Sequence, residues 1–287
     1  MPADHYENFP VASLLLPRRL RRPVAVIYRF ARSADDFADE GDLAPAERLA
    51  RLEDYREELR RLQAGRPPRA PLFAALEEAV REHGLPCEPL FDLLDAFSQD
   101  VVKKRYASFG EVMDYCRRSA DPVGRLMLVL YGEARRPGYP VSVARSDAVC
   151  SALQLINFWQ DVELDYAKDR IYLPQDEMAR YGVSEAQIAE RRADGRWAAL
   201  MAFQIARARA MLESGAPLAT TLRGRIGLEL RMIVQGGARI LDKLDQARGD
   251  VFRHRPVLRA WDWPLMLGRA LSMRRQSHEP PTTRGAD

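Results

Sequence analysis

One stretch of the chain reads Val24-Ala-Val-Ile-Tyr-Arg-Phe-Ala-Arg-Ser-Ala-Asp-Asp-Phe-Ala-Asp39, which is largely apolar and yet contains several acids. Its hydrophobic residues recur with the period of an α-helix. Four polar residues are spaced by four, three and four positions: Tyr28, Arg32, Asp35 and Asp39. Residues at these spacings lie on one face of a helix. The stretch therefore predicts a helix over 23–39 that carries a polar stripe in apolar surroundings.

A second stretch repeats this combination. It reads Ala152-Leu-Gln-Leu-Ile-Asn-Phe-Trp-Gln-Asp-Val-Glu-Leu-Asp165. Its polar residues are spaced by three, four and four positions: Gln154, Asn157, Asp161 and Asp165. They form a single stripe on a predicted helix that is otherwise rich in Leu, Ile, Phe and Trp.

The paired acids indicate a metal site. Carboxylates four positions apart on one helix face repel each other, and burying them without a cation costs far more. Oxygen ligands without His or Cys select a hard ion, so we expect Mg²⁺, which Mn²⁺ can replace, bound together with diphosphate oxygens. The expected metal ligands are Asp35, Asp36, Asp39, Asp161 and Asp165. One acidic run alone would be typical of a solvated helix, and only the presence of two favours the metal site.

The rest of the chain predicts an all-α protein. Convincing alternating strands are absent, and no repeat or Pro/Gly/Ser-rich linker divides the sequence. We expect one helical domain over residues 1–275 and a disordered polar tail over 276–287. Helices are predicted at 10–17, 23–39, 45–64, 70–83, 87–103, 108–118, 122–133, 141–165, 184–192, 195–215, 217–247 and 256–271.

Composition excludes several classes of function. Hydrophobic residues make up 47% and charged residues 30% of the 287 residues, an ordinary globular balance. The net charge of +3 is too small to indicate a nucleic-acid partner. The cysteines form no CxxC pair and the histidines no metal-binding spacing, which argues against zinc.

The sequence contains no secretory signal and no run of about 18 apolar residues, the length that a membrane span needs. We therefore expect a cytoplasmic protein. Near the C-terminus, the run Trp261-Asp-Trp-Pro-Leu-Met-Leu267 is aromatic and apolar. It fits a peripheral contact with the inner face of the membrane, or else a terminal helix docked on the core.

The two stripes resemble motifs of the squalene/phytoene synthase family, which condenses isoprenyl diphosphates. The resemblance extends from residue 5 to about residue 271. It is carried by Tyr28-x3-Arg32-x2-Asp35-Asp36-x2-Asp39, by Gln154-x2-Asn157-x3-Asp161-x3-Asp165, and by Arg170-Ile-Tyr-Leu-Pro174. It implies an all-α isoprenoid-synthase fold with a central active-site cavity between the two acidic helices.

The resemblance also implies roles for individual residues. Mg²⁺ would be bound by Asp35, Asp39, Asp161 and Asp165. The expected catalytic residues are these four aspartates together with Tyr28 and Arg32. The residues expected to hold the isoprenoid diphosphate or to shape its pocket are Arg32, Tyr115, Gln154, Asn157, Gln160, Arg170 and Tyr172.

One position departs from the family pattern. Many family members carry Arg immediately before the first aspartate of the second motif, where this chain has Gln160. Loss of a permanent cation there should weaken the grip on a diphosphate. This departure suggests a substrate requirement different from that of enzymes that condense two diphosphates.

The segments His5–Ser13 and Asn157–Asp161 look closest to the bacterial hopanoid-pathway branch, which converts presqualene diphosphate to hydroxysqualene. This branch implies quenching by water without NADPH, and functional coupling to a presqualene diphosphate synthase. Two alternatives stay open. One is condensation of two farnesyl diphosphates to presqualene diphosphate or squalene, or phytoene synthesis; the other is an inactive relative that acts as a scaffold.

Overall fold

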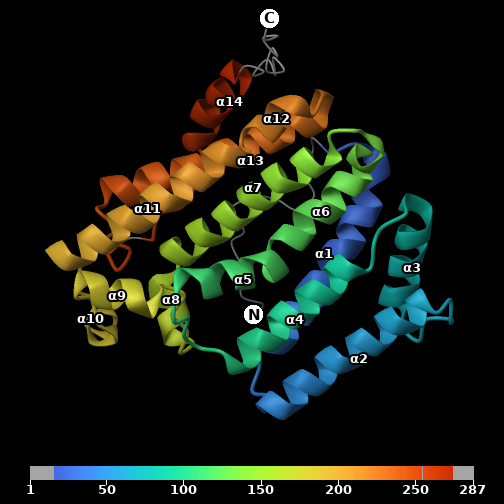
Figure 1. Cartoon of the computed structure of the whole chain (residues 1–287), viewed down its shortest axis with the longest axis horizontal. Coiled ribbons are helices and arrows are strands. Elements are labelled where there is room, and N and C mark those ends of the chain that lie inside the picture. Colours follow the sequence, from blue (N-terminus) through green and yellow to red (C-terminus); the bar gives the residue numbers. More distant parts are fainter. Residues whose placement is uncertain (1–15, 254, 274–287) are drawn as a thin grey trace, which may run out of the picture.

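The computed structural model describes residues 16–253 and 255–273, and within them the regular structure is helical (Figure 1). An isolated parallel bridge joins Arg105 to Ile171. The prediction of an all-α chain is confirmed. The helices are α1 (Arg18–Asp39), α2 (Pro45–Gln63), α3 (Pro71–His83), α4 (Glu88–Val102), α5 (Phe109–Ser119), α6 (Asp121–Leu130), the 3₁₀-helix η1 (Glu133–Arg135), α7 (Tyr139–Gln160), α8 (Val162–Ala167), α9 (Gln175–Tyr181), α10 (Glu185–Ala189), α11 (Gly195–Gly215), α12 (Pro217–Thr221), α13 (Gly224–Gln246) and α14 (Asp262–Ser272).

The two acidic stretches belong to different packing neighbourhoods. Helix α1 packs against α2, α3 and α4, and its buried face contributes Val26, Ile27 and Phe30 to one hydrophobic core. Helix α7 packs against α5, α6, α11 and α13, and it contributes Leu155 and Trp159 to a second core. Helices α4, α5 and α6 contact one another and connect the two groups (Figure 1).

Two predicted helices are interrupted, and a third begins later than predicted. The helix predicted over 141–165 breaks at Asp161, whose backbone leaves the helical region at φ −109° and ψ 13°. The helix predicted over 217–247 is divided into α12 and α13 before Gly224, whose φ of 65° favours glycine. Only the second half of the predicted helix 256–271 is helical, because α14 begins at Asp262. Helix α9 was not predicted.

Some predictions fall outside the described residues. They include residues 10–15 of the helix predicted at 10–17, the segment His5–Ser13, and the tail 276–287. The division into a domain over 1–275 and a disordered tail therefore stays a prediction. Within the described ranges, no helix is both long and apolar enough to cross a membrane.

Candidate active site

The two acidic stripes meet at a guanidinium group. Arg170, which follows α8, donates a hydrogen bond to the carboxylate of Asp39, the last residue of α1, although 131 positions separate the two residues. The ammonium of Lys168 lies 3.2 Å from the same carboxylate. The side chains of Arg170 and Asp39 are only 9% and 17% exposed. The first acidic stripe and the motif that begins at Arg170 therefore converge on one largely buried site.

Backbone hydrogen bonds fix the segment that carries Arg170. The N–H of Arg170 donates to the carbonyl of Asp165 at 2.8 Å, and the N–H of Ile171 donates to the carbonyl of Lys104 at 3.0 Å. The bridge between Arg105 and Ile171 adds to this connection. The segment after α8 is thus tied to the segment after α4, which directs the guanidinium of Arg170 toward α1.

Asp165 lies one helical turn after Asp161, and its N–H donates to the Asp161 carbonyl at 2.8 Å. Burial, and then the charge of Asp161, raise the pKa of Asp165 to about 8, and the charge of Asp39 adds to the increase. Carboxylates of both stripes therefore lie close enough to repel one another. At neutral pH, a proton or a cation has to compensate this repulsion.

The two carboxyl groups of the first stripe behave differently. Burial, and then the charge of Asp39, raise the pKa of Asp35 to about 6. Burial acts in the same direction on Asp39, but the hydrogen bond and charge of Arg170 outweigh it and lower the pKa of Asp39. Among the described residues, the nearest cation to Asp35 is Arg32, at the longer distance of 3.4 Å. Asp39 is thus matched to a cation, whereas Asp35 is compensated only in part.

Asp36 has a different environment from the rest of the expected metal ligands. Its carboxylate lies 2.7 Å from the guanidinium of Arg32, and its side chain is 43% exposed. Together with Tyr28 and Arg32, Asp36 lines a groove between α1 and α3. The structure therefore brings Asp35, Asp39, Asp161 and Asp165 into one region and turns Asp36 toward a neighbouring groove.

A cation that the sequence analysis missed lies at Asp161. Arg255, in the loop before α14, donates to both carboxylate oxygens of Asp161, and its Nη2 is 3.2 Å from Oδ2. The adjacent Gln160 is 1% exposed, and its side-chain amide donates to the carbonyl of Pro256. The role of Gln160 in substrate binding stays a prediction. In the structure its side chain holds the loop that carries Arg255.

A second missed residue is Asp100, near the end of α4. It accepts hydrogen bonds from the hydroxyl of Tyr115 at 2.6 Å and from the hydroxyl of Tyr172 at 3.3 Å. Burial raises the pKa of Asp100 to about 7, although the hydrogen bond from Tyr115 opposes the shift. The ring of Tyr172 stacks on that of Phe158, with centroids 3.7 Å apart. Asp100 thus organises a cluster of aromatic side chains beside Arg170.

The other two members of the second stripe lie on α7 before the break. Gln154 is half-buried and Asn157 is exposed. The carbonyl of Asn157 accepts a hydrogen bond from the N–H of Asp161 at 2.9 Å. Both residues are in position to continue the stripe, and their roles in substrate binding stay predictions.

The donors at the site suit a metal that is shared with a phosphate group. Within residues 16–253 and 255–273, no three side chains of His, Cys, Asp or Glu come together to form a complete metal site. Mg²⁺ commonly takes one or two carboxylates and completes its shell with phosphate oxygens and water. In the same ranges, the buried Nε of Arg170 has no hydrogen-bond acceptor, so it can donate to a phosphate oxygen. The residues therefore fit Mg²⁺ bound together with a diphosphate.

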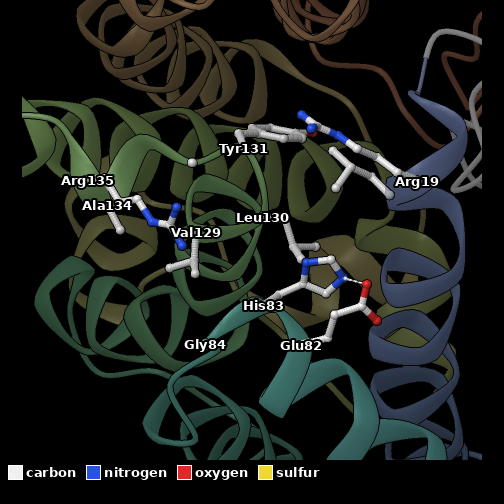
Figure 2. A pocket seen from close by; sticks show the side chains of 11 residues that line it. Arg19, Glu82, His83, Gly84, Val129, Leu130, Tyr131, Ala134 and Arg135 are labelled. Atoms are coloured by element: carbon white, nitrogen blue, oxygen red, sulfur yellow. Dashed lines mark ion pairs between the residues drawn. The ribbon is translucent and has the colours of Figure 1, made fainter.

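A separate cavity of about 450 Å³ lies where the start of α1 meets the ends of α3 and α6 (Figure 2). Its lining includes Arg19, His83, Tyr131 and Arg135, and His83 lies 3.8 Å from the carboxylate of Glu82. None of the predicted site residues lines this cavity. The acidic site is therefore a distinct region of the molecule.

Several known proteins are similar to this chain. The chain is 34% identical over 245 residues to a hydroxysqualene synthase of Sinorhizobium fredii, covering 84% of this chain and 81% of that protein. It is 31% identical over 279 residues to a phytoene synthase of Arthrospira platensis, covering 92% and 88% of the two chains.

Among solved structures, the squalene synthase HpnC from Alicyclobacillus acidocaldarius superposes with a TM-score of 0.77 at 37% identity, covering 85% of this chain and 90% of that one. The model of the squalene/phytoene synthase family matches residues 3–262, a range that includes both acidic stripes and Arg170. The chain therefore belongs to the squalene/phytoene synthase family.

Proposed function

We propose that this chain is a Mg²⁺-dependent enzyme that converts presqualene diphosphate and water to hydroxysqualene and diphosphate. The observation that carries the proposal is the convergence of Asp35, Asp39 and Asp165 around the guanidinium of Arg170, next to Asp161 and its partner Arg255. Such a set of acids and cations is suited to hold a metal–diphosphate group rather than a neutral ligand.

In this proposal, the basic side chains receive the leaving group. In the structure the aspartates form ion pairs with four basic side chains: Arg32, Lys168, Arg170 and Arg255. Bound Mg²⁺, or Mn²⁺ in its place, would supply Lewis acidity that stabilises the charge of the departing diphosphate. With the aspartates holding such an ion, the guanidinium groups of Arg170 and Arg255 would be available to donate to the diphosphate oxygens.

The aromatic cluster suits the carbon skeleton that is left behind. Ionisation of presqualene diphosphate leaves a cyclopropylcarbinyl cation, which aromatic faces stabilise and apolar walls shield from stray water. Tyr172 and Phe158 present stacked rings beside Arg170, and Tyr115 lies against both. A single water molecule then attacks the rearranged cation, so that no NADPH is consumed. Asn157 is a candidate for orienting this water, whereas the amide of Gln160, the other candidate from the sequence, is bonded to Pro256. A diphosphate oxygen is an alternative base.

The choice of branch is supported by similarity to a protein named hydroxysqualene synthase and by Gln160, which stands where many relatives carry Arg. The second candidate is condensation of two isoprenyl diphosphates to presqualene diphosphate, squalene or phytoene, because the chain is also similar to a phytoene synthase. We propose that a presqualene diphosphate synthase supplies the substrate, and that the enzyme works in the cytoplasm at the inner face of the membrane.

The test is a product assay. Purified protein is incubated with Mg²⁺ and either presqualene diphosphate or farnesyl diphosphate, and the extracts are analysed by mass spectrometry. We expect hydroxysqualene from presqualene diphosphate and no product from farnesyl diphosphate. Formation of presqualene diphosphate or squalene from farnesyl diphosphate alone would assign the chain to the condensing branch instead. No turnover of any isoprenyl diphosphate would favour the scaffold alternative.

A further inference from the structure

Helix α14 is fixed to the protein at its first residue. Asp262 is fully buried, and its carboxylate accepts hydrogen bonds from the guanidinium of Arg239 at 2.7 Å and from the ammonium of Lys243, both on α13. The backbone N–H of Arg259 donates to the same carboxylate at 2.7 Å. Loss of this carboxylate would leave two partly buried cations without their shared ion-pair partner. The orientation of α14 on α13 is therefore well determined.

Only a narrow face of α14 is covered. Its buried residues follow one another at intervals of four positions: Asp262, Met266 and Ala270. Most of the remaining surface is apolar and exposed, and Figure 1 shows α14 at the edge of the helical body. Of the nine exposed large hydrophobic residues in the described part of the chain, five lie here: Trp261 (64%), Trp263 (39%), Leu265 (41%), Leu267 (43%) and Leu271 (63%). We call these five residues the α14 surface.

In the segment that forms the α14 surface the exposed charges are basic, although Arg269 pairs with the half-buried Asp242 at 3.1 Å and Arg253 with the half-buried Asp250 at 3.4 Å. The exposed charged residues between 255 and 273 in the described part are Arg259 and Arg269, and Arg253 lies just before them. The one acid of this segment, Asp262, is fully buried. In the sequence, Arg274 and Arg275 follow directly. An apolar surface surrounded by arginines complements a surface that is apolar inside and anionic outside.

We propose that the α14 surface docks on a lipid bilayer that carries anionic headgroups. Tryptophan is enriched at the boundary between headgroups and acyl chains, and the guanidinium of Arg259 lies 5.1 Å from the ring of Trp261, where both can reach that boundary. Arginines at the edge of the surface would contact lipid phosphates. A second copy of the same basic surface would instead bring like charges together, which disfavours a symmetric dimer through α14.

The α14 surface is also connected to the acidic site. One open groove is lined by Arg255, Leu258, Trp261 and Trp263. At its inner end Arg255 is paired with Asp161. A long-chain lipid could pass between bilayer and site along this groove. This consequence for delivery of substrate or product rests on the proposed function, whereas the docking itself does not.

Docking is tested without any substrate, by co-sedimentation of the full chain with vesicles. One set contains phosphatidylcholine only, and the other contains about a quarter phosphatidylglycerol. We expect binding to the anionic vesicles, with a blue shift of tryptophan fluorescence, and at least about tenfold weaker binding to neutral ones. The variant Leu265→Ser/Leu267→Ser/Leu271→Ser should bind anionic vesicles at least about tenfold more weakly, because these residues supply the inserted apolar area.

The matched control is Val102→Ser/Val123→Ser/Val141→Ser, which removes three exposed hydrophobic residues from other helices. It should bind vesicles within about twofold of the wild type, and both variants should keep the helical circular dichroism and the detergent-assayed turnover of the wild type. Equal loss in both variants, or full binding by the α14 variant, would overturn the proposal. So would a dimer in sedimentation velocity that the α14 variant dissociates, without any vesicle binding. Because the vesicle assay uses no diphosphate, its result is independent of the product assay.

Discussion

The guanidinium of Arg170 and the carboxylate of Asp39 form an ion pair that joins the segment after α8 to the end of α1. Both side chains are largely buried, where the surroundings are of low polarity. Each charge therefore needs the other as its partner. The pair aligns the acidic stripe of α1 with the segment after α8. It also keeps a cation next to the position that the proposal assigns to the diphosphate.

Replacement of Arg170 should therefore affect stability as well as activity. Arg170→Gln leaves Asp39 partly buried without its main partner, and we expect a loss of about 3 kcal/mol in the free energy of unfolding, measured in urea. The double variant Asp39→Asn/Arg170→Gln should regain most of this stability while remaining inactive. As a control, Arg22→Gln breaks an ion pair with Glu78 whose side chains are 72% and 41% exposed, and should cost less than about 1 kcal/mol. A loss for Arg170→Gln no larger than this control would contradict a buried pair.

The raised pKa of Asp165 predicts how stability depends on pH without metal. The folded protein binds this proton more tightly than the unfolded chain, whose ordinary value is 3.8, so protonation stabilises the fold at low pH. That stabilisation is lost as the pH rises from about 4 towards the folded value of about 8. Asp165→Asn carries no charge at any pH, and at pH 8 it should be more stable than the wild type by at least about 1 kcal/mol.

The measurement is a series of urea unfolding curves in the presence of a chelator. The difference between wild type and Asp165→Asn should grow with pH and level off above about pH 8. Addition of Mg²⁺ with pyrophosphate should reduce it, because a bound cation compensates the carboxylate in the wild type only. A difference that is constant across this range would show that Asp165 is not buried among like charges.

Two substitutions of Asp100 should differ in stability and in turnover. Asp100→Leu leaves the buried hydroxyls of Tyr115 and Tyr172 without their acceptor, and each unsatisfied group costs about 1–3 kcal/mol. Asp100→Asn keeps a carbonyl oxygen as acceptor and should retain most of the stability. We expect turnover to fall much further in the Leu variant, since displaced rings no longer line the site. Equal unfolding free energies for the two variants would refute this positioning role.

Gln160→Arg would introduce a cation next to Asp161, and the structure predicts that it harms this protein. The side chain of Gln160 is 1% exposed and is bonded to Pro256, so a buried guanidinium should destabilise the fold by about 2 kcal/mol. It should also displace the loop and move Arg255 away from Asp161. Steady-state kinetics should show a higher KM for the diphosphate substrate. A lower KM would mean that Gln160 itself faces the diphosphate.

The sequence predicted the helical fold and the two acidic stripes because both depend on local periodicity. A spacing of four places Asp35 and Asp39 on one helix face, and likewise Asp161 and Asp165, independently of tertiary contacts. The break at Asp161 was not predictable in this way, since it accompanies contacts of Gln160 and Asp161 with residues almost one hundred positions away, at separations of 96 and 94.

The missed site residues share one property. Asp100 and Arg255 act through partners that are distant in sequence, and neither belongs to a periodic polar pattern. Asp100 follows the apolar residues of α4 and precedes a lysine pair, which is also typical of an ordinary solvated helix end. Arg255 lies in an irregular loop whose path is set by the buried anchor at Asp262. Their functional position emerges only from tertiary packing.

The central claim is that the two acidic stripes bind one metal–diphosphate group together. It is tested most directly by calorimetric titration of pyrophosphate with Mg²⁺ into the wild type, Asp35→Asn, Asp161→Asn and the double variant. We predict Mg²⁺-dependent binding to the wild type, a loss of at least about tenfold in each single variant, and little further loss in the double variant, because the residues act as one unit. Independent, additive losses, or pyrophosphate binding that does not require a divalent cation, would contradict the account.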